Sequence, residues 1–309
     1  MIRRKETRTN PLDSLANDIL DAPSMDSSST AIHLCVPEMF GGYGGIQTYM
    51  RLLGRALADQ GRLARITSLN DSENDLSAVD WLKGIPFESA DGSKARFVGL
   101  LARHSEPRRH FLFGHINQAP IGLPLRWSRR AEGYGIILHG VEAWKRLSLP
   151  GRKALANANF VISTTPFTRR TVERENGLSL DHHAILPLAV EPDRFQGDEK
   201  TAAPRKLANG ESLQVLTVAR LDADEKYKGV DHTLEAIARR GSAGQRVHYV
   251  IIGDGSDRQR LEQLADSLGI AEYVDFLGSV TDDRLNRAFV ESDVFAMPSA
   301  GEGFGLVYL

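Results

Sequence analysis

Residues 31–61 read AIHLCVPEMFGGYGGIQTYMRLLGRALADQG, and this stretch decides the fold class. Its apolar start, Ala31 to Val36, predicts a buried strand. The four glycines between Gly41 and Gly45 predict a tight turn, and the segment from Ile46 to Gln60 predicts a helix that ends at Gly61. A strand, a glycine turn and a helix in this order are typical of a parallel α/β sheet.

The same alternation continues along the chain, so the fold class is α/β with parallel sheets covered on both faces. We expect two Rossmann-like α/β domains that face each other across a cleft. The further predicted strands are 65–69, 110–113, 134–138, 160–163, 184–186, 213–218, 247–252, 273–277 and 294–297, and the helices predicted after residue 211 are 230–240, 257–268 and 282–291.

Changes of composition divide the chain. Residues 1–30 are polar and rich in Ser and Asp, which predicts a loose leader. A first domain is expected over 31–195, a polar linker over 196–211, and a second domain over 212–309. In such sheets ligands bind at the carboxyl ends of the strands.

The composition is that of an ordinary globular protein, with 41% hydrophobic and 25% charged residues and a net charge of −2. This balance gives no overall field that favours nucleic acid. Basic clusters at 103–109 and 126–130 are interpreted as solvated helix faces, with peripheral contact to an anionic membrane as the alternative. The single cysteine, Cys35, allows no intrachain disulfide and fits a reducing, cytoplasmic compartment.

The glycine turn is the first candidate binding site. Glycines such as Gly44 and Gly45, at the start of a helix, let the backbone approach a phosphate or a sugar closely. Gln47 stands where the last glycine of a dinucleotide fingerprint would be, so a dinucleotide site is disfavoured. The alternative is a tight turn without a ligand.

Arg220 and Lys228 form the second candidate site, because Arg220 follows a predicted strand and Lys228 precedes a predicted helix. Two cations at strand ends suit a leaving diphosphate, whose developing charge they would offset. The alternative is a basic loop whose cations pair with the acids at 222–225. Asp222 and Asp224 could bind a metal ion, but the neighbouring lysines disfavour this, and no metal is expected.

His139 comes directly after a predicted strand, and Gly140 and Glu142 accompany it. A histidine in this place can orient a sugar hydroxyl or move a proton. His115 has a similar position, but without such neighbours we interpret it as structural.

The last nine residues, Gly301 to Leu309, read GEGFGLVYL after an apolar run. The glycines around Glu302 predict that its carboxylate faces a ligand at the start of a helix. Gly253 and Gly278 also follow predicted strands, and with Arg220, Lys228 and Glu302 they are expected to surround one strand-end cleft.

At this point the chain resembles the family-4 glycosyltransferases of the two-domain GT-B architecture, over about Ala31 to the end. The similarity is carried by the segments 219–231, 252–255, 276–280 and 301–305. The resemblance implies catalytic roles for His139 and Glu302, a diphosphate held by Arg220 and Lys228, and further donor contacts at Gly44, Gly45, Gly253, Gly278, Val280, Phe304 and Gly305.

The implied activity is transfer of a hexose from a nucleotide-diphosphate sugar, such as a UDP- or GDP-sugar, to a hydroxyl with retention of anomeric configuration. The resemblance implies no metal and no cofactor. The implied partner is a glycan or lipid-linked acceptor, met in the cytoplasm or at the inner face of the membrane, and the wider role is polysaccharide biosynthesis. Two alternatives remain: a nucleotide-sugar epimerase of the same architecture and an inactive sugar-nucleotide-binding fragment.

The family has a second glutamate eight residues after the position of Glu302, and the chain stops at Leu309. We therefore expect a C-terminally truncated chain with an incomplete second domain, weak donor affinity and little or no transfer activity.

Overall fold

A computed structural model describes residues 31–42, 44–72, 80–107, 109–189, 212–242 and 247–308. The predicted leader and the predicted linker lie outside these residues. Two compact units divide the chain, the first formed by residues up to Val190 together with Gly303–Leu309, and the second by Glu191–Glu302. The second domain was expected to span 212–309, whereas the structure groups Gly303–Leu309 with the first unit.

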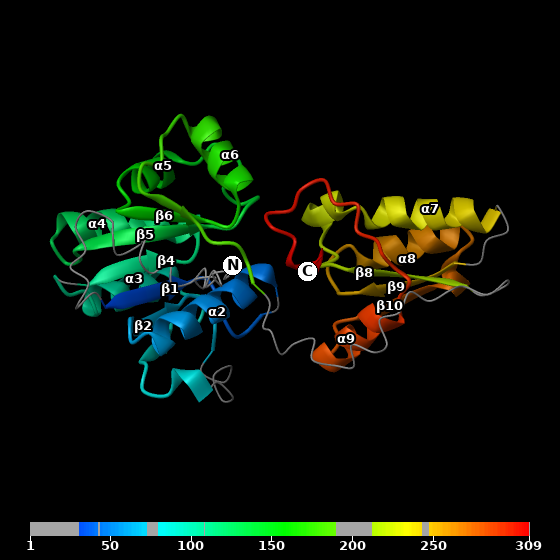
Figure 1. Cartoon of the computed structure of the whole chain (residues 1–309), viewed down its shortest axis with the longest axis horizontal. Coiled ribbons are helices and arrows are strands. Elements are labelled where there is room, and N and C mark those ends of the chain that lie inside the picture. Colours follow the sequence, from blue (N-terminus) through cyan, green and yellow to red (C-terminus); the bar gives the residue numbers. More distant parts are fainter. Residues whose placement is uncertain are drawn as a thin grey trace, which may run out of the picture. The chain divides into compact units, whose positions relative to one another are not determined.

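The first unit is an α/β unit around a parallel sheet whose strands follow the order β3-β2-β1-β4-β5-β6-β7. Figure 1 shows β6, β5, β4 and β1 side by side in this order. Its strands are β1 (Ile32–Val36), β2 (Leu63–Ser68), β3 (Phe87–Ser89), β4 (His110–Phe113), β5 (Gly133–Leu138), β6 (Phe160–Ser163) and β7 (His183–Ile185), and its helices are α2 (Gly45–Asp59), α3 (Lys94–Arg103), α4 (Gly122–Trp127), α5 (Leu149–Ala156) and α6 (Pro166–Asn176), with 3₁₀ turns η2 (Asp80–Leu82) and η3 (Ile116–Ile121).

Two apolar cores lie on the two faces of this sheet, because successive side chains of a strand point to opposite sides. In β1, Cys35 packs in the core that holds α3, α4, α5 and α6, whereas Leu34 packs in the core that holds α2. The predicted burial of Cys35 is therefore confirmed.

The second unit repeats the plan with the parallel order β10-β9-β8-β11. Apolar side chains place α7 and α8 on one face of this sheet and α9 on the other, as Figure 1 shows. Its strands are β8 (Leu213–Val218), β9 (Val247–Ile252), β10 (Val274–Gly278) and β11 (Val294–Phe295), and its helices are α7 (Val230–Ser242), α8 (Arg258–Ser267) and α9 (Asp282–Glu291), with 3₁₀ turns η6 (Ala223–Lys228) and η7 (Ala271–Tyr273); η8 (Leu306–Tyr308) belongs to the first unit.

Parallel sheets in both units confirm the predicted α/β class. The prediction of a helix that begins at Glu302 is wrong for the described residues. Residues 297–305 form a loop that leads to the 3₁₀ turn η8. Gly305 has a φ of +78°, in the left-handed region, which interrupts a right-handed helix.

Candidate functional site

The glycine turn lies where the sequence predicted it, between β1 and α2. Gly44 precedes α2 and provides no side-chain cap for the first N–H groups of the helix. A Cβ at Gly44 would lie 2.7 Å from Oε1 of Gln47, and one at Gly42 would lie 2.3 Å from Oε2 of Glu38. Gln47 and Glu38 are themselves joined by a 2.9 Å hydrogen bond, so a Cβ at either glycine would displace the end of one of these two side chains.

His139 follows β5 and is 6% exposed. Its Nε2 lies 2.7 Å from the carbonyl oxygen of Gly114, after β4, and its own carbonyl accepts a 2.6 Å hydrogen bond from Oγ1 of Thr164, after β6. The carboxylate of Glu142 accepts hydrogen bonds from the N–H groups of His139 and Gly140, at 2.6 and 3.1 Å. Residues after three neighbouring strands thus hold His139, the imidazole through Gly114 and the backbone through Thr164 and Glu142.

The contacts of the His139 ring decide its tautomer. A bond to a carbonyl oxygen requires a proton on Nε2, and burial lowers the pKa of the ring while the Glu142 carboxylate opposes this shift. Nδ1 is buried and has no hydrogen-bond partner within the described residues. The neutral ring therefore keeps one buried acceptor without a hydrogen-bond partner in the part of the chain that the structure describes.

Tyr49 was not selected from the sequence. Its ring, on α2, packs edge-on against His139 with 5.3 Å between ring centroids, and its hydroxyl donates a 3.3 Å hydrogen bond to the carbonyl of Leu186. Tyr49 therefore links the helix that follows the glycine turn to the predicted histidine. In the sequence Tyr49 is one of several residues on the apolar face of a predicted helix, and this pattern does not distinguish it from core residues.

His115 caps a 3₁₀ turn, because its Nδ1 accepts a 3.1 Å hydrogen bond from the N–H of Asn117. This confirms the structural interpretation.

In the second unit, Arg220 and Lys228 converge on one carboxylate. Arg220 forms an ion pair with Glu225, and Nζ of Lys228 lies 3.6 Å from Oε2 of the same residue. Lys228 also lies 3.7 Å from Oε1 of Glu302. The structure thus brings three predicted residues together, and Glu225 is the acid that the alternative interpretation of this loop named.

Close backbone packing explains how the Glu302 segment meets Lys228. The N–H of Ala300 donates a 2.8 Å hydrogen bond to the carbonyl of Tyr227. Gly229 has a φ of +77°, and a Cβ there would lie 2.6 Å from the carbonyl oxygen of Pro298. Glycine at 229 therefore allows the loop after β11 to lie against η6.

Gly253 and Gly278 also have backbone reasons to be glycine. Gly253 has a φ of +127°, and a Cβ there would lie 1.9 Å from the carbonyl oxygen of Ala219. Its N–H donates a 2.9 Å hydrogen bond to Gly278, which has a φ of +67°. Val280, two residues later, is half-buried against the core of α9. These contacts explain the glycines without a ligand, and donor binding by them stays a prediction.

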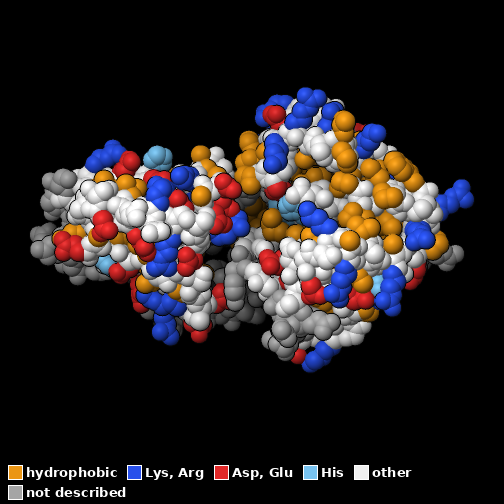
Figure 2. Space-filling model, turned by 180° about the vertical axis from the view of Figure 1, so that it is seen from behind, with side chains coloured by type: hydrophobic (Ala, Val, Ile, Leu, Met, Phe, Trp, Pro, Cys, Tyr) orange, Lys and Arg blue, Asp and Glu red, His pale blue; other side chains and the backbone are white. Residues whose placement is uncertain are grey.

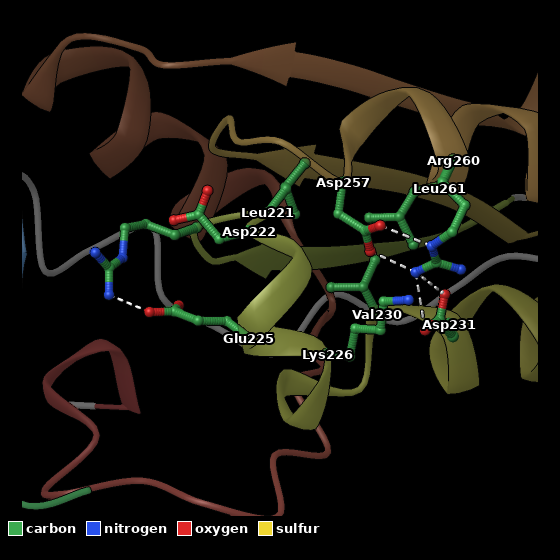
Figure 3. A pocket seen from close by; sticks show the side chains of 10 residues that line it. Leu221, Asp222, Glu225, Lys226, Val230, Asp231, Asp257, Arg260 and Leu261 are labelled. Carbon is green, nitrogen blue, oxygen red and sulfur yellow. Dashed lines mark hydrogen bonds and ion pairs between the residues drawn. The ribbon is translucent and has the colours of Figure 1, made fainter. Parts of the chain in front are cut away.

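A shallow depression lies at this cluster and is lined in part by Arg220 and Glu225 (Figure 3). Arg260 lines the depression, with hydrogen bonds to Asp257 at 2.7 Å and to Asp231 at 3.2 Å. Glu225 lies at the opposite end and pairs with Arg220. The ion pairs of Arg260 tie α8 to α7, and they raise its pKa. Their role is to hold the start of α7, which follows Lys228.

Comparison with known proteins identifies the chain. Residues 198–309 match the family model described as glycosyl transferases group 1. A D-inositol 3-phosphate glycosyltransferase of Stackebrandtia nassauensis is 33% identical over 310 residues, which cover 87% of this chain and 69% of that protein. The chain belongs to the group 1 glycosyl transferases.

Other relatives align over shorter stretches. The D-inositol 3-phosphate glycosyltransferase of Geodermatophilus obscurus is 32% identical over 51% of this chain and 36% of its own length. A GDP-mannose-dependent phosphatidylinositol monomannoside mannosyltransferase of Mycolicibacterium smegmatis is 31% identical over 62% of this chain and 53% of its own length. The chain thus spans between about a third and about a half of the length of these relatives.

The fold agrees with membership of the group 1 glycosyl transferases. A sucrose-phosphate synthase from Thermosynechococcus elongatus superposes with a TM-score of 0.70 at 20% identity, over 90% of this chain and 78% of that one. This likeness confirms Rossmann-like α/β units of the GT-B type.

The surface of this member of the group 1 family carries apolar side chains, which gather on the face drawn in Figure 2. The large hydrophobic residues most exposed in the first unit are Trp127, Leu149 and Phe167. Among the described residues, no helix has the length and hydropathy needed to cross a membrane, and no three His, Cys, Asp or Glu side chains gather to hold a metal ion.

Phe304 and Gly305, predicted to meet the donor sugar, group with the first unit, together with Gly303. A Cβ at Gly303 would lie 2.5 Å from the carbonyl oxygen of His139. The structure therefore sets Gly303 beside His139, and contact of Phe304 and Gly305 with a sugar stays a prediction.

Proposed function

We propose that this glycosyltransferase moves a hexose from a nucleotide-diphosphate sugar to an acceptor hydroxyl with retention of anomeric configuration. The observation that carries the proposal is the cluster of Arg220, Lys228, Glu225 and Glu302, which lies within the segment matched by the family model. Lys228 is 17% exposed, so its charge acts in a partly desolvated place, where it is stronger than in water.

In this proposal, Arg220 and Lys228 bind the diphosphate of the donor and offset the charge that develops as the sugar–phosphate bond breaks. Glu302 then accepts hydrogen bonds from sugar hydroxyls, and the leaving phosphate helps to deprotonate the acceptor. His139, neutral and held by Gly114, orients a hydroxyl of the bound sugar. The two cations take the part that a metal ion has in other transferases, so transfer needs neither a metal nor a cofactor.

The names of the relatives support a nucleotide-sugar donor and a polyol acceptor, because one is named as GDP-mannose-dependent and two are named for D-inositol 3-phosphate. We propose a UDP- or GDP-hexose as donor and a glycan or lipid-linked acceptor.

The test is a thermal-shift screen of UDP, GDP and ADP and their hexoses, followed by transfer assays with the donors that raise the melting temperature. We expect one nucleotide family to stabilise the protein, turnover to persist with a chelator, and proton NMR of the product to show the anomeric configuration of the donor. A product with inverted anomeric configuration would overturn the proposed retention, and a strict metal requirement would overturn the proposed metal independence. Incubation without acceptor separates transfer from epimerisation, which would give an isomerised nucleotide sugar.

A further inference from the structure

Asp71, which no sequence pattern singled out, lies against the glycine turn. It is fully buried, three residues after β2. Its N–H donates a 3.2 Å hydrogen bond to Oγ of Ser68 at the end of β2, and its carbonyl accepts one from Oγ of Ser89 at the end of β3. The backbone of Asp71 is therefore fixed to two strand ends of the first sheet.

The carboxylate of Asp71 accepts three backbone hydrogen bonds from consecutive residues at the start of the glycine turn. The N–H of Met39 lies 2.8 Å from Oδ2, and those of Phe40 and Gly41 lie 2.8 and 2.7 Å from Oδ1. Arg51 of α2 adds a 2.9 Å hydrogen bond to the carbonyl of Met39. Residues 39–41 are thus held by hydrogen bonds to two side chains outside the turn, Asp71 and Arg51.

A buried carboxylate is costly unless hydrogen bonds replace its lost hydration. Consecutive N–H groups that point to one place form a nest that favours an anion. Here the nest of residues 39–41 is filled by Asp71, whereas the N–H groups at the start of α2 have no side-chain cap. The two halves of the turn therefore differ. The N–H groups of the first half are hydrogen-bonded to Asp71, whereas Gly44 and Gly45 in the second half are exposed.

We propose that Asp71 is a positioning residue for donor transfer: by holding residues 39–41, it sets the direction in which Gly44 and Gly45 present the start of α2 to the phosphate of the nucleotide sugar. The inference rests on the proposed function, because it assigns a geometric role within that reaction. Asp71 itself touches no substrate and acts through the turn.

The experiment replaces Asp71 by Asn in the whole protein. An amide keeps the size of the side chain, but its NH₂ group cannot accept a hydrogen bond, so at least one of the three N–H groups loses its partner. We expect hydrogen exchange of the amides at 39–41 to rise at least about tenfold as the turn opens locally. We expect kcat to fall about ten- to hundredfold, because displacement of about 1 Å costs that much in a positioned reaction.

Nucleotide affinity distinguishes a positioning role from a general loss of structure, which would lower kcat and affinity together. Arg220 and Lys228 are proposed to supply most of the nucleotide affinity, and Asp71→Asn leaves them unchanged. The Kd of the nucleotide should therefore stay within about threefold while kcat falls. Ser89→Ala is the matched control, since it removes a hydrogen bond to the backbone of Asp71 and leaves the carboxylate contacts in place. The Ser89→Ala variant should have a kcat close to that of the wild type, and its amides at 39–41 should still exchange slowly.

Three results would overturn the inference: unchanged kcat in Asp71→Asn despite a loosened turn, unchanged exchange at 39–41, or equal losses of kcat in both variants. If Asp71→Asn does not fold, the wild-type protein gives the answer, because the amide of the exposed residue Gly41 should exchange slowly, and fast exchange contradicts the inference. Failure of the proposed function would look different: the wild-type protein would show no transfer with any nucleotide sugar, while exchange would still report whether Asp71 orders the turn.

Discussion

Nζ of Lys228 lies 3.7 Å from Oε1 of Glu302 and 3.6 Å from Oε2 of Glu225. One ammonium group therefore lies between two carboxylates that are 77 residues apart in the sequence. They come together because the loop after β11 packs against η6. A diphosphate that binds Lys228 must share its charge with both acids. This relationship governs how substitutions in the cluster should behave.

Lys228→Ala should weaken nucleotide binding by about 2 kcal/mol, or about thirtyfold, because it removes a charge-assisted contact and leaves two acids beside the phosphate. Arg220→Ala should cost less, since the Arg220 side chain is 65% exposed and its charge is screened by water. Titration calorimetry with the preferred nucleotide measures both. Lys226→Ala is the control and should change affinity little; unchanged affinity in Lys228→Ala would contradict the assignment.

Glu302→Gln should separate nucleotide binding from sugar transfer. The amide keeps the size of the side chain but removes the charge that pairs with Lys228, so the free nucleotide should bind as well as before or slightly better. The kcat/KM for the nucleotide sugar should fall by about a hundredfold if Glu302 contacts the sugar in the transition state. Comparison of the Kd of the nucleotide with kcat/KM decides this, and equal losses in both would assign Glu302 to nucleotide binding instead.

Gly253→Ala and Gly241→Ala should change stability in opposite directions. Gly253 has a left-handed φ, and a Cβ there would overlap the carbonyl oxygen of Ala219, so we expect a loss of about 2 kcal/mol or more in the free energy of unfolding. Gly241 lies in α7 with open space around the added Cβ, so alanine there should stabilise by about 0.5–1 kcal/mol. Urea unfolding of both variants measures the difference, and a neutral Gly253→Ala would show that the backbone relaxes at low cost.

Acid should destabilise the first unit through buried histidines. Burial, with Arg109 and Arg65 nearby, lowers the pKa of His33 from 6.5 to about 3, and its Nε2 lies 2.8 Å from Oγ1 of Thr67. The unfolded chain takes up this proton below pH 6.5 and the folded chain does not, so stability is fully present above pH 6.5 and is lost as the pH falls from 6.5 toward 3. This one histidine should contribute about 1.4 kcal/mol per pH unit in that window.

The measurement is the free energy of unfolding between pH 7 and pH 5, in the wild type and in His33→Gln, whose amide can still meet Thr67. The variant should be less stable at pH 7 but should lose less stability on acidification. His232→Gln, at an exposed position of α7, serves as the control and should keep the wild-type slope. Equal slopes in all three proteins would remove His33 as a source of acid sensitivity.

The sequence by itself determined the α/β class and the alternation of strands and helices, because buried parallel strands are apolar runs and glycines mark where strands end. The short strand β3 was not predicted. The strands 110–113, 160–163, 213–218 and 247–252 and the helix 282–291 were predicted with the bounds that the structure has. His139, Arg220 and Lys228 could be selected for the same reason, since strand ends in a parallel sheet are where side chains meet ligands.

Only the tertiary structure revealed what holds these residues. Asp71 and Tyr49 act through contacts with residues far along the chain, and such contacts leave no periodic signal in the local sequence. The prediction of a helix at Glu302 was wrong because Gly305, three residues later, has a left-handed φ. The apolar pattern of the sequence does not reveal this backbone angle. Hydrogen bonds between loops depend on how the sheet brings strand ends together, so their physical cause lies in the packing of the whole unit and not in any one segment.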